Sequence, residues 1–312
     1  MKVKLTCCVI AMGMLFLPCF SMALETQKIN PSDNFAITPT PESELLKNEE
    51  SVEPPKLFAN QFLEFGLMYH YFDYKEDIDP PGKSTEKGWL PGFYLGWSYN
   101  KKNDIYSKVL IEFSYGETEY DGTTQSGTPI SFSNDNDQFL FRGEWNIGYN
   151  FVIAKDISLK PYAGYGYRYW SRGDAKVTAT YASYKERYYW HYLPVGMRAD
   201  VTLGDKLFIE PNAGFRWMFY GRMTAYLSEL DPGYNDPKFK LGNKLGWYAE
   251  IPVRYKFSPY WSVVVKPWYE YSKIGKSNDD DLTYCGYYDG TYYEPASRTH
   301  QYGLNVGLVA SY

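Results

Sequence analysis

The sequence predicts an all-β fold, namely a ten-stranded antiparallel up-and-down transmembrane β-barrel with short periplasmic turns and long extracellular loops. Three observations predict it. Apolar residues alternate with polar or small residues along ten runs between residues 61 and 312, and this period of two is that of a β-strand. The connections between the runs are alternately short and long. Aromatic residues make up 19% of the chain, and a membrane barrel can place them on its lipid-facing wall and in its interfacial girdles.

The ten runs are the predicted strands. In chain order they cover residues 63–71, 92–100, 108–116, 139–149, 159–169, 193–201, 209–219, 245–256, 261–272 and 302–312. One face of each run is apolar and aromatic, whereas the other carries charges and glycines. We assign the apolar face to lipid, because small and polar residues suit a narrow lumen. A soluble lipocalin-like barrel, with its apolar face inside, is the alternative.

The connections support the membrane assignment. The short ones are residues 100–104, 151–156, 202–205 and 257–259, and the long ones are residues 75–88, 121–136, 171–186, 222–240 and 275–298. A soluble β-sandwich has no reason for this alternation, whereas an outer-membrane barrel has short periplasmic turns and long outer loops. Both ends of the barrel are then expected in the periplasm.

The N-terminal region predicts export. Lys2 and Lys4 precede an apolar stretch over residues 5–20, and Ser21-Met22-Ala23 matches a small-x-small cleavage site. We therefore expect a cleaved signal peptide over residues 1–23. An uncleaved anchor helix is the alternative, although the apolar stretch is short for a span of about 20 residues.

The part that follows the signal peptide divides into two regions. Residues 24–56 are rich in Pro, Ser, Glu and Asn and lack alternation, which predicts a mobile periplasmic segment. Residues 57–312 are the predicted barrel. Cys285 is the single cysteine left after cleavage, so an intramolecular disulfide is not possible.

Charge and hydropathy exclude other classes of protein. The mean hydropathy of −0.47 excludes a polytopic helical membrane protein. The net charge of −5 leaves no electrostatic footprint for nucleic acid. The three histidines lie far apart in the sequence, so we expect neither a metal centre nor a cofactor.

Two segments resemble bacterial outer-membrane β-barrel proteins. Residues 159–169 read LKPYAGYGYRY, a strand pattern common in such barrels, and residues 304–312 read LNVGLVASY, which resembles their C-terminal assembly signal ending in Tyr312. The resemblance implies a place in the outer membrane of a Gram-negative cell. It also implies three partners: the barrel-insertion machinery, outer-membrane lipid and lipopolysaccharide. Ten strands further resemble the architecture of the omptin proteases and the Opc-type adhesins.

The lumen is expected to hold balanced charges. Its predicted acids are Glu64, Glu112, Glu144, Asp200, Glu210, Glu250 and Glu270, and its predicted bases are Arg142, Lys160, Arg168, Arg198, Arg216, Arg254 and Lys266. A barrel of about eight strands is filled by side chains, and ten strands lie near that limit. Because unpaired buried charges are costly, we expect a plug of ion pairs. A narrow charged pore is the alternative.

Catalysis is not expected. The omptin resemblance implies an Asp pair facing an Asp–His pair across the barrel mouth. Asp135 and Asp137 lie in the second long loop, but the facing loop offers Glu229, Asp231 and Asp236 without a histidine. The last loop is instead rich in Tyr, which favours recognition. The predicted function is therefore surface binding of an unknown extracellular ligand, adhesion or envelope structure, with a porin-like small-solute pore and an omptin-like protease as alternatives.

Overall fold

The computed structural model describes residues 60–78, 82–123, 129–173, 176–177 and 182–312. The predicted signal peptide, residues 1–23, and the predicted segment over residues 24–56 lie outside the described residues.

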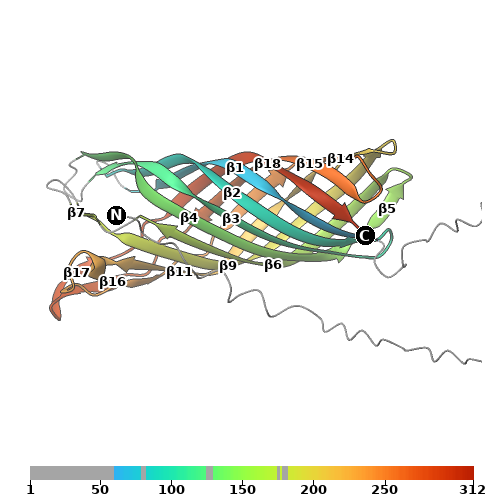
Figure 1. The fold of residues 1–312 in the computed structure, drawn as a ribbon. Helices are drawn as coiled ribbons and strands as arrows, with labels where there is room; N and C mark the ends of the chain where they lie inside the picture. The colour runs from blue at the N-terminus through green and yellow to red at the C-terminus, as the bar shows by residue number, and fades with distance from the viewer. Residues whose placement is uncertain (1–59, 79–81, 124–128, 174–175, 178–181) are drawn as a thin grey trace, which may run out of the picture. The chain divides into compact units, whose positions relative to one another are not determined.

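Ten strands form a closed antiparallel barrel (Figure 1), which confirms the predicted fold class. They are β1 (Gln61–Glu76), β2 (Ser84–Asn100), β3 (Ile105–Thr123), β4 (Pro129–Tyr149), β6 (Ile157–Arg172), β9 (Lys185–Leu203), β11 (Asn212–Tyr226), β13 (Leu245–Glu250), β15 (Trp261–Ile274) and β18 (Ser297–Ser311). Closure occurs between the first and last strands, where Phe62 lies opposite Ser311 and Glu76 lies opposite Ser297.

Shorter strands complete the wall at the periplasmic end. They are β5 (Phe151–Ala154), β10 (Leu207–Ile209) and β14 (Val253–Lys256). Pro211 separates β10 from β11, and Pro252 separates β13 from β14, because proline has no N–H to donate to a ladder. The wall nevertheless continues, since the Glu210 N–H donates to the Pro252 carbonyl at 2.8 Å.

The extracellular end carries additional short elements. These are β7 (Lys176–Val177), β8 (Ala182–Ser183), the 3₁₀ turn η1 (Leu227–Glu229), β12 (Lys238–Lys240), β16 (Asp280–Tyr284) and β17 (Tyr287–Tyr292). Figure 1 places the β16–β17 hairpin at the end of the barrel opposite the C-terminus. Within the described ranges, no helix is long and apolar enough to cross a membrane.

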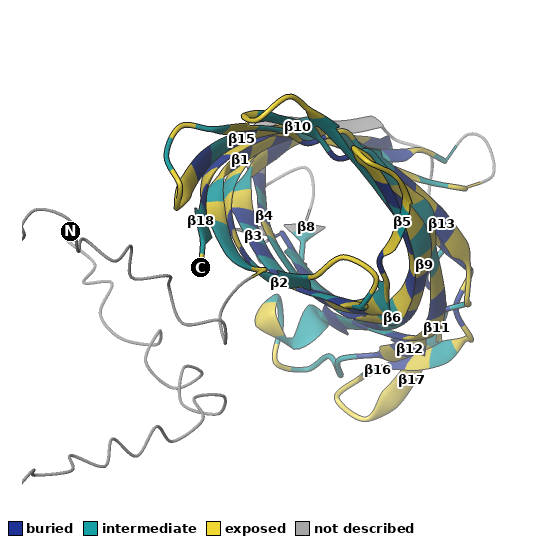
Figure 2. Cartoon of the chain, turned by 90° about the vertical axis from the view of Figure 1, so that its right-hand side faces the viewer, coloured by how far each residue is buried: buried dark blue, intermediate teal, exposed yellow. Residues whose placement is uncertain are grey.

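The alternation of the sequence becomes the two faces of the wall (Figure 2). On β1, Leu67 points outward and is 73% exposed, whereas its neighbour Met68 points inward and is 7% exposed. The outward apolar positions of β1 run from Leu63 to Tyr71, which matches the length of about 9–11 residues that a membrane-spanning strand needs. The apolar face therefore contacts lipid, as predicted.

Aromatic side chains mark both borders of the lipid-facing zone. Outward-facing aromatic residues of the outer girdle include Tyr71, Trp89, Tyr115, Tyr269 and Tyr302, and those of the periplasmic girdle include Tyr149, Phe151, Tyr255, Trp261 and Tyr312. Interfacial Tyr and Trp are typical of such borders. Beyond the outer girdle the outward positions become charged, beginning with Asp73 on β1 and Lys87 on β2. The strands therefore continue past the membrane into the extracellular space.

Candidate functional site

The middle of the lumen is crossed by a network of arginines and carboxylates. Arg142 and Arg216 each donate from Nη1 to Glu270 Oε2 at 2.8 Å, and Arg168 forms an ion pair with the other oxygen of Glu270. Arg142 also pairs with Glu112. These residues come from β3, β4, β6, β11 and β15, and in the sheet β11 and β15 are neighbours neither of the other three strands nor of each other. The contacts therefore span the lumen.

Glu144 extends this network along β4. Its Oε2 accepts from Arg216 Nε at 2.9 Å and from the Tyr192 hydroxyl at 2.8 Å. Gly166 makes room for this contact, because a Cβ there would lie 2.1 Å from the Tyr192 ring. A small inward residue thus lets an aromatic ring lie across the strand.

A second network fills the periplasmic end of the lumen. Lys160 forms an ion pair with Asp200, and Arg198 pairs with Glu210 and lies 3.5 Å from Asp200. Arg254 Nη2 donates to Glu210 Oε1 at 2.8 Å. Two carboxylates thus join three bases from β6, β9 and β14.

Between these networks, Lys266 Nζ lies 3.6 Å from Glu64 Oε1, and Glu250 accepts from Asn212 Nδ2 at 2.9 Å. All the lumen residues expected from the sequence except Glu250 thus join ion pairs within the described part of the chain. The expected balance of charge is nevertheless incomplete. Lys108, on the inward face of β3 and 8% exposed, adds a base that the prediction left out. Lys108 lies four residues before Glu112, so the strand period of two could have predicted that it faces inward.

An aromatic and aliphatic cluster closes the outer half of the lumen. Its buried members are Phe72, Tyr74, Leu90, Trp170, Tyr188, Trp190, Tyr192, Met218, Met223, Ala225, Phe239, Leu241 and Ile274. Trp170 stacks on Tyr188 with ring centroids 4.6 Å apart. The sequence analysis missed this cluster, because it expected the inner face to be polar along its whole length.

Above the aromatic cluster, Arg172 sits among acids at the extracellular mouth. Its Nη1 lies 3.1 Å from Glu76 Oε1 and 2.7 Å from Glu186 Oε2, and its Nε donates to Glu86 Oε1. Burial raises the pKa of both Glu86 and Glu186. The sequence analysis missed this group, because the strands extend further into the long loops than the apolar alternation does.

Glu294 adds a further carboxyl group to the mouth. The Tyr188 hydroxyl lies 2.9 Å from Glu186 Oε2 and 2.8 Å from Glu294 Oε1. One hydroxyl has one proton to donate, so one of these two carboxyl groups must supply a second proton. Consistently, burial and the nearby Glu186 carboxylate raise the pKa of Glu294 well above its ordinary value.

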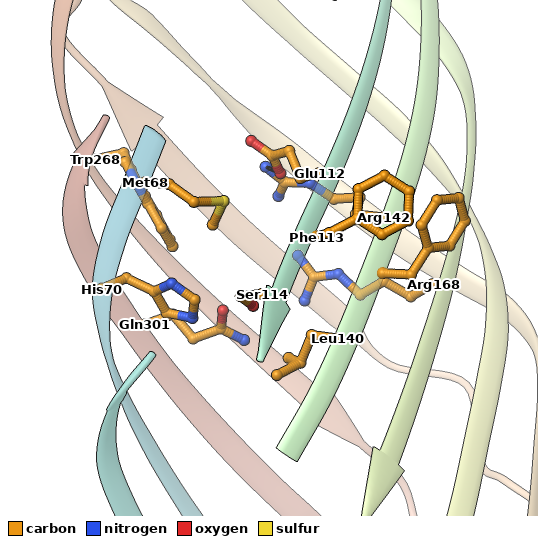
Figure 3. Close-up of a pocket in the computed structure, with 11 residues that line it drawn as sticks. Met68, His70, Glu112, Phe113, Ser114, Leu140, Arg142, Arg168, Trp268 and Gln301 are labelled. Atoms are coloured by element: carbon orange, nitrogen blue, oxygen red, sulfur yellow. Dashed lines mark ion pairs between the residues drawn. The ribbon is translucent and has the colours of Figure 1, made fainter. Parts of the chain in front are cut away.

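The cavities found among the described residues in the middle of the lumen are small. Figure 3 shows a cavity where His70, Arg142 and Arg168 converge. Its volume is about 30 Å³, which is large enough to hold a water molecule. His70 is 1% exposed, and both of its ring nitrogens lack a partner. Such a space suits a bridging water and not a substrate.

The last two outer loops are bonded into one unit, which we call the outer platform (residues 226–238 and 275–297). The Cys285 N–H donates to the Gly233 carbonyl at 2.7 Å, and the Thr283 N–H donates to Asn235 Oδ1 at 2.7 Å. Tyr284 packs on Tyr234 with ring centroids 4.8 Å apart. These contacts join the β16–β17 hairpin to the neighbouring loop.

The hairpin of the outer platform exposes aromatic side chains. Tyr287 is 80% exposed and Tyr288 is 67% exposed, with Tyr284 and Tyr293 also exposed. The free thiol of Cys285 lies beside them. Cys285 and Gly286 both have positive φ, 49° and 81°, as the tight turn of a two-residue hairpin requires.

The residues considered for catalysis are not brought together. Asp137 accepts from the Tyr115 hydroxyl at 3.0 Å on the outer surface, and the side chain of Asp135 lies outside the described residues. His70 lies in the lumen, while His191 and His300 lie on the outer face beside Tyr165 and Tyr269. All three histidines therefore lie in the barrel wall and none is at the mouth. Among the described residues, no group of three or more His, Cys, Asp or Glu is arranged to hold a metal ion.

Tyr312, the predicted assembly residue, closes the periplasmic rim. Its N–H donates to the Gln61 carbonyl at 3.1 Å, and its carbonyl accepts from the Gln61 N–H at 3.2 Å. The ring is 45% exposed on the outer face. The terminal aromatic residue thus belongs to the periplasmic girdle at the seam where the barrel closes.

Comparison with known proteins identifies similar solved structures and a matching family model. Similar solved folds include the outer-membrane protease OmpT from Escherichia coli (9% identity, 84% of this chain, 99% of that chain, TM-score 0.49), the outer-membrane protein OprG from Pseudomonas aeruginosa (11%, 82%, 97%, 0.38) and the attachment invasion locus protein Ail of Yersinia pestis (13%, 80%, 99%, 0.30). No curated protein matches the chain. The family model of the autotransporter β-domain matches residues 56–263, which is more than half of the chain. The match confirms the predicted resemblance to bacterial outer-membrane barrels, and the chain belongs to the autotransporter β-domain family.

Proposed function

We propose that this outer-membrane barrel is not an enzyme and that its outer platform binds a partner outside the cell, in adhesion or in envelope structure. The observation that carries the proposal is the exposure of Tyr287 and Tyr288 on a hairpin that the neighbouring loop holds in place. Tyrosine supplies a large contact area at a small entropic cost. A surface ordered before binding also loses less freedom on binding. The proposal includes export by a cleaved signal peptide, residues 1–23, in a Gram-negative cell.

The interior supports a binding role more than a transport role. Ion pairs such as Arg168–Glu270 cross the lumen, and the aromatic cluster lies above them. A small-solute pore is the second candidate. It is favoured by cavities at the two ends, of about 460 Å³ beside Arg254 and about 300 Å³ beside Arg172. To pass from one end cavity to the other, a solute would have to displace both the ion pairs and the aromatic cluster.

A test of binding compares two surface variants on cells that display the protein. The double variant Tyr287→Ser with Tyr288→Ser removes the exposed rings, and Ile78→Ser removes an exposed apolar side chain from the first outer loop as the matched control. Both are applied to an array of immobilised glycans and proteins. We expect the spots bound by the unmodified protein to be lost in the tyrosine variant and kept in the control. Equal loss or equal retention would contradict the proposal.

Planar-bilayer recording separates the two candidates. The closed lumen predicts little or no steady current through the purified barrel. A large and steady conductance would replace the binding proposal by the pore, because the same charges would then line an open water path. Cleavage of test peptides by the purified protein would instead support the omptin-like alternative.

A further inference from the structure

The outer platform carries far more acids than bases. Its acids are Glu229, Asp231, Asp236, Asp279, Asp280, Asp281, Asp289 and Glu294, and its bases are Lys238 and Lys276. This excess is at least as large as that of the whole chain, which has 37 acidic and 32 basic residues. The rest of the chain is therefore close to balance, and the negative charge is concentrated on the outer platform.

Neutral donors hold the carboxylates of the outer platform. Asp231 Oδ1 accepts from the Gly233 N–H at 2.8 Å, and Asp280 Oδ2 accepts from the backbone N–H of Lys238 at 2.8 Å. An N–H group orients a carboxylate but leaves its charge in place. Within the described ranges, neither carboxylate forms an ion pair. The platform thus presents ordered negative charge that its own bases do not neutralise.

Exposed rings lie beside carboxylates on the β16–β17 hairpin. Thr291 gives its hydroxyl proton to Asp281 Oδ1 at 2.9 Å, so the Tyr288 hydroxyl donates to Thr291 Oγ1 at 2.8 Å. The Tyr284 hydroxyl in turn donates to Asp231 Oδ2 at 3.2 Å. Tyr284 and Tyr288 are both exposed. The pairing of an exposed ring with a carboxylate therefore occurs twice on this surface.

One ring of the platform already holds a cation of the protein itself. Lys276 Nζ lies 3.6 Å from the centroid of the Tyr293 ring. The negative face of an aromatic ring attracts ammonium and guanidinium groups. Tyr287 and Tyr288 are 80% and 67% exposed, and no cation of the described residues lies over either ring. These two rings are therefore open to a cation from outside the chain.

The acidic surface continues into the extracellular mouth. The cavity of about 300 Å³ there is lined by Tyr293 and Glu294 of the outer platform and by Glu76, Glu86 and Glu186 of the barrel. Its bases already have acidic partners, because Arg172 pairs with the three barrel acids and Lys83 pairs with Asp121. A side chain that enters this cavity thus meets carboxyl groups without a free base beside them.

We propose that the partner of the outer platform is a basic polypeptide segment, whose Arg and Lys side chains lie over Tyr287 and Tyr288 and pair with Asp281 and Asp289. A guanidinium group stacks on a ring and bonds to a carboxylate at the same time. An uncharged glycan would use the rings but would gain nothing from the acids, so charge complementarity favours the basic partner. The inference rests on the proposed binding function and specifies its partner.

The test measures fluorescence anisotropy of labelled probes that bind the full chain in neutral detergent. The probes are a peptide of alternating Arg and Ser, the same peptide with Glu in place of Arg, and a neutral chito-oligosaccharide. The acid variant is Asp281→Asn with Asp289→Asn. Glu117→Gln with Glu119→Gln is its matched control, because it removes two exposed acids from the extracellular part of β3.

Two ring variants separate the aromatic face from apolar area. Tyr287→Leu with Tyr288→Leu keeps apolar side chains but removes the rings, whereas Tyr287→Phe with Tyr288→Phe keeps the rings. Heat-modifiable gel mobility verifies that each variant is folded.

We expect the unmodified protein, the matched control and the Phe variant to bind the Arg peptide and not the Glu peptide. The acid variant should bind it at least about threefold more weakly, and the Leu variant at least about fivefold more weakly. Binding should also weaken as the salt concentration rises.

The contrary outcomes separate the partner from the binding role. Equal weakening in the matched control would mean attraction by net charge alone and would overturn the inference. Tyrosine-dependent binding of the chito-oligosaccharide without binding of the Arg peptide would also overturn it, but would leave the proposed function standing. Spots on the glycan and protein array that persist in the serine variant of Tyr287 and Tyr288 would instead overturn the proposed function itself.

Discussion

Glu270 forms ion pairs with Arg142, Arg168 and Arg216, and we call this central network the ionic plug. The variant Glu270→Gln tests how much the shared carboxylate stabilises the barrel. Arg142 keeps Glu112 and Arg216 keeps Glu144 in this variant. Arg168 loses its carboxylate, which is its one ion-pair partner among the described residues. The expected loss of unfolding free energy is that of one broken buried pair, about 3–5 kcal/mol, reduced where water reaches the lumen. Glutamine has nearly the same size, so no cavity adds to this figure.

Arg168→Gln, which keeps part of the side-chain volume, provides the comparison that makes the test specific. It removes one base, but Glu270 keeps Arg142 and Arg216, each at 2.8 Å. No carboxylate is left unpaired, so this variant should cost less than Glu270→Gln. A lumen of separate one-to-one ion pairs would predict the larger loss, because a carboxylate would then be left unpaired.

The assay is urea unfolding of the refolded barrel in lipid vesicles, followed by tryptophan fluorescence. Glu119→Gln serves as the control, because Glu119 is an exposed acid on the extracellular part of β3. If Arg168→Gln were as destabilising as Glu270→Gln, or if Glu270→Gln matched the control, the shared carboxylate would not be the centre of the plug.

Three further predictions concern the wall, the seam and the mouth. Trp145→Arg places a cation on the lipid-facing surface, where Trp145 is 50% exposed, and should cost about 2–4 kcal/mol near the bilayer midplane in vesicle unfolding, whereas Lys102→Ala in a periplasmic turn should cost little. Deleting Tyr312 should lower the amount of membrane-inserted protein in cell fractionation, and normal insertion would contradict this. Burial raises the pKa of Glu294, so the unfolded chain loses this proton first and the folded mouth loses stability as pH rises above about 4.5 towards the raised pKa. Protection factors of the β16–β17 amides, which correct for the base-catalysed rise of intrinsic exchange with pH, should therefore be lower at about pH 9 than at about pH 5, and Glu294→Gln should make this difference smaller.

The sequence was sufficient for the fold because a membrane barrel is governed by local alternation. Leu67 and Met68 are neighbours in the chain, and the period of two alone assigns one to lipid and the other to the lumen. The same parity placed Arg142, Glu144 and Glu270 inside. Strand number followed from the count of ten alternating runs, and the alternating lengths of the connections agree with an even number.

Local alternation fails where both faces of a strand have the same character. Over residues 188–192 both faces are aromatic, so the inward ring of Trp190 could not be told from its outward neighbours. Beyond the membrane both faces become polar, and the inward pair Glu86 and Arg172 was missed for that reason. The bulge between Met218 and Tyr220 also shifts the parity of β11, which a strict period of two does not anticipate.

What only the tertiary structure decided is which distant residues meet. Glu270 receives three arginines from β4, β6 and β11 because the closed wall brings those strands around one axis. Arg298 likewise lies opposite Lys75 on one side and Lys273 on the other because of the seam between the first and last strands. Whether a side chain points inward or outward depends on its position along one strand, and the alternation in the sequence predicts it. Closure and register depend on all the strands together. Where apolar and polar residues alternate, the sequence therefore determined which side chains face inward, and the closed barrel decided what each of them binds.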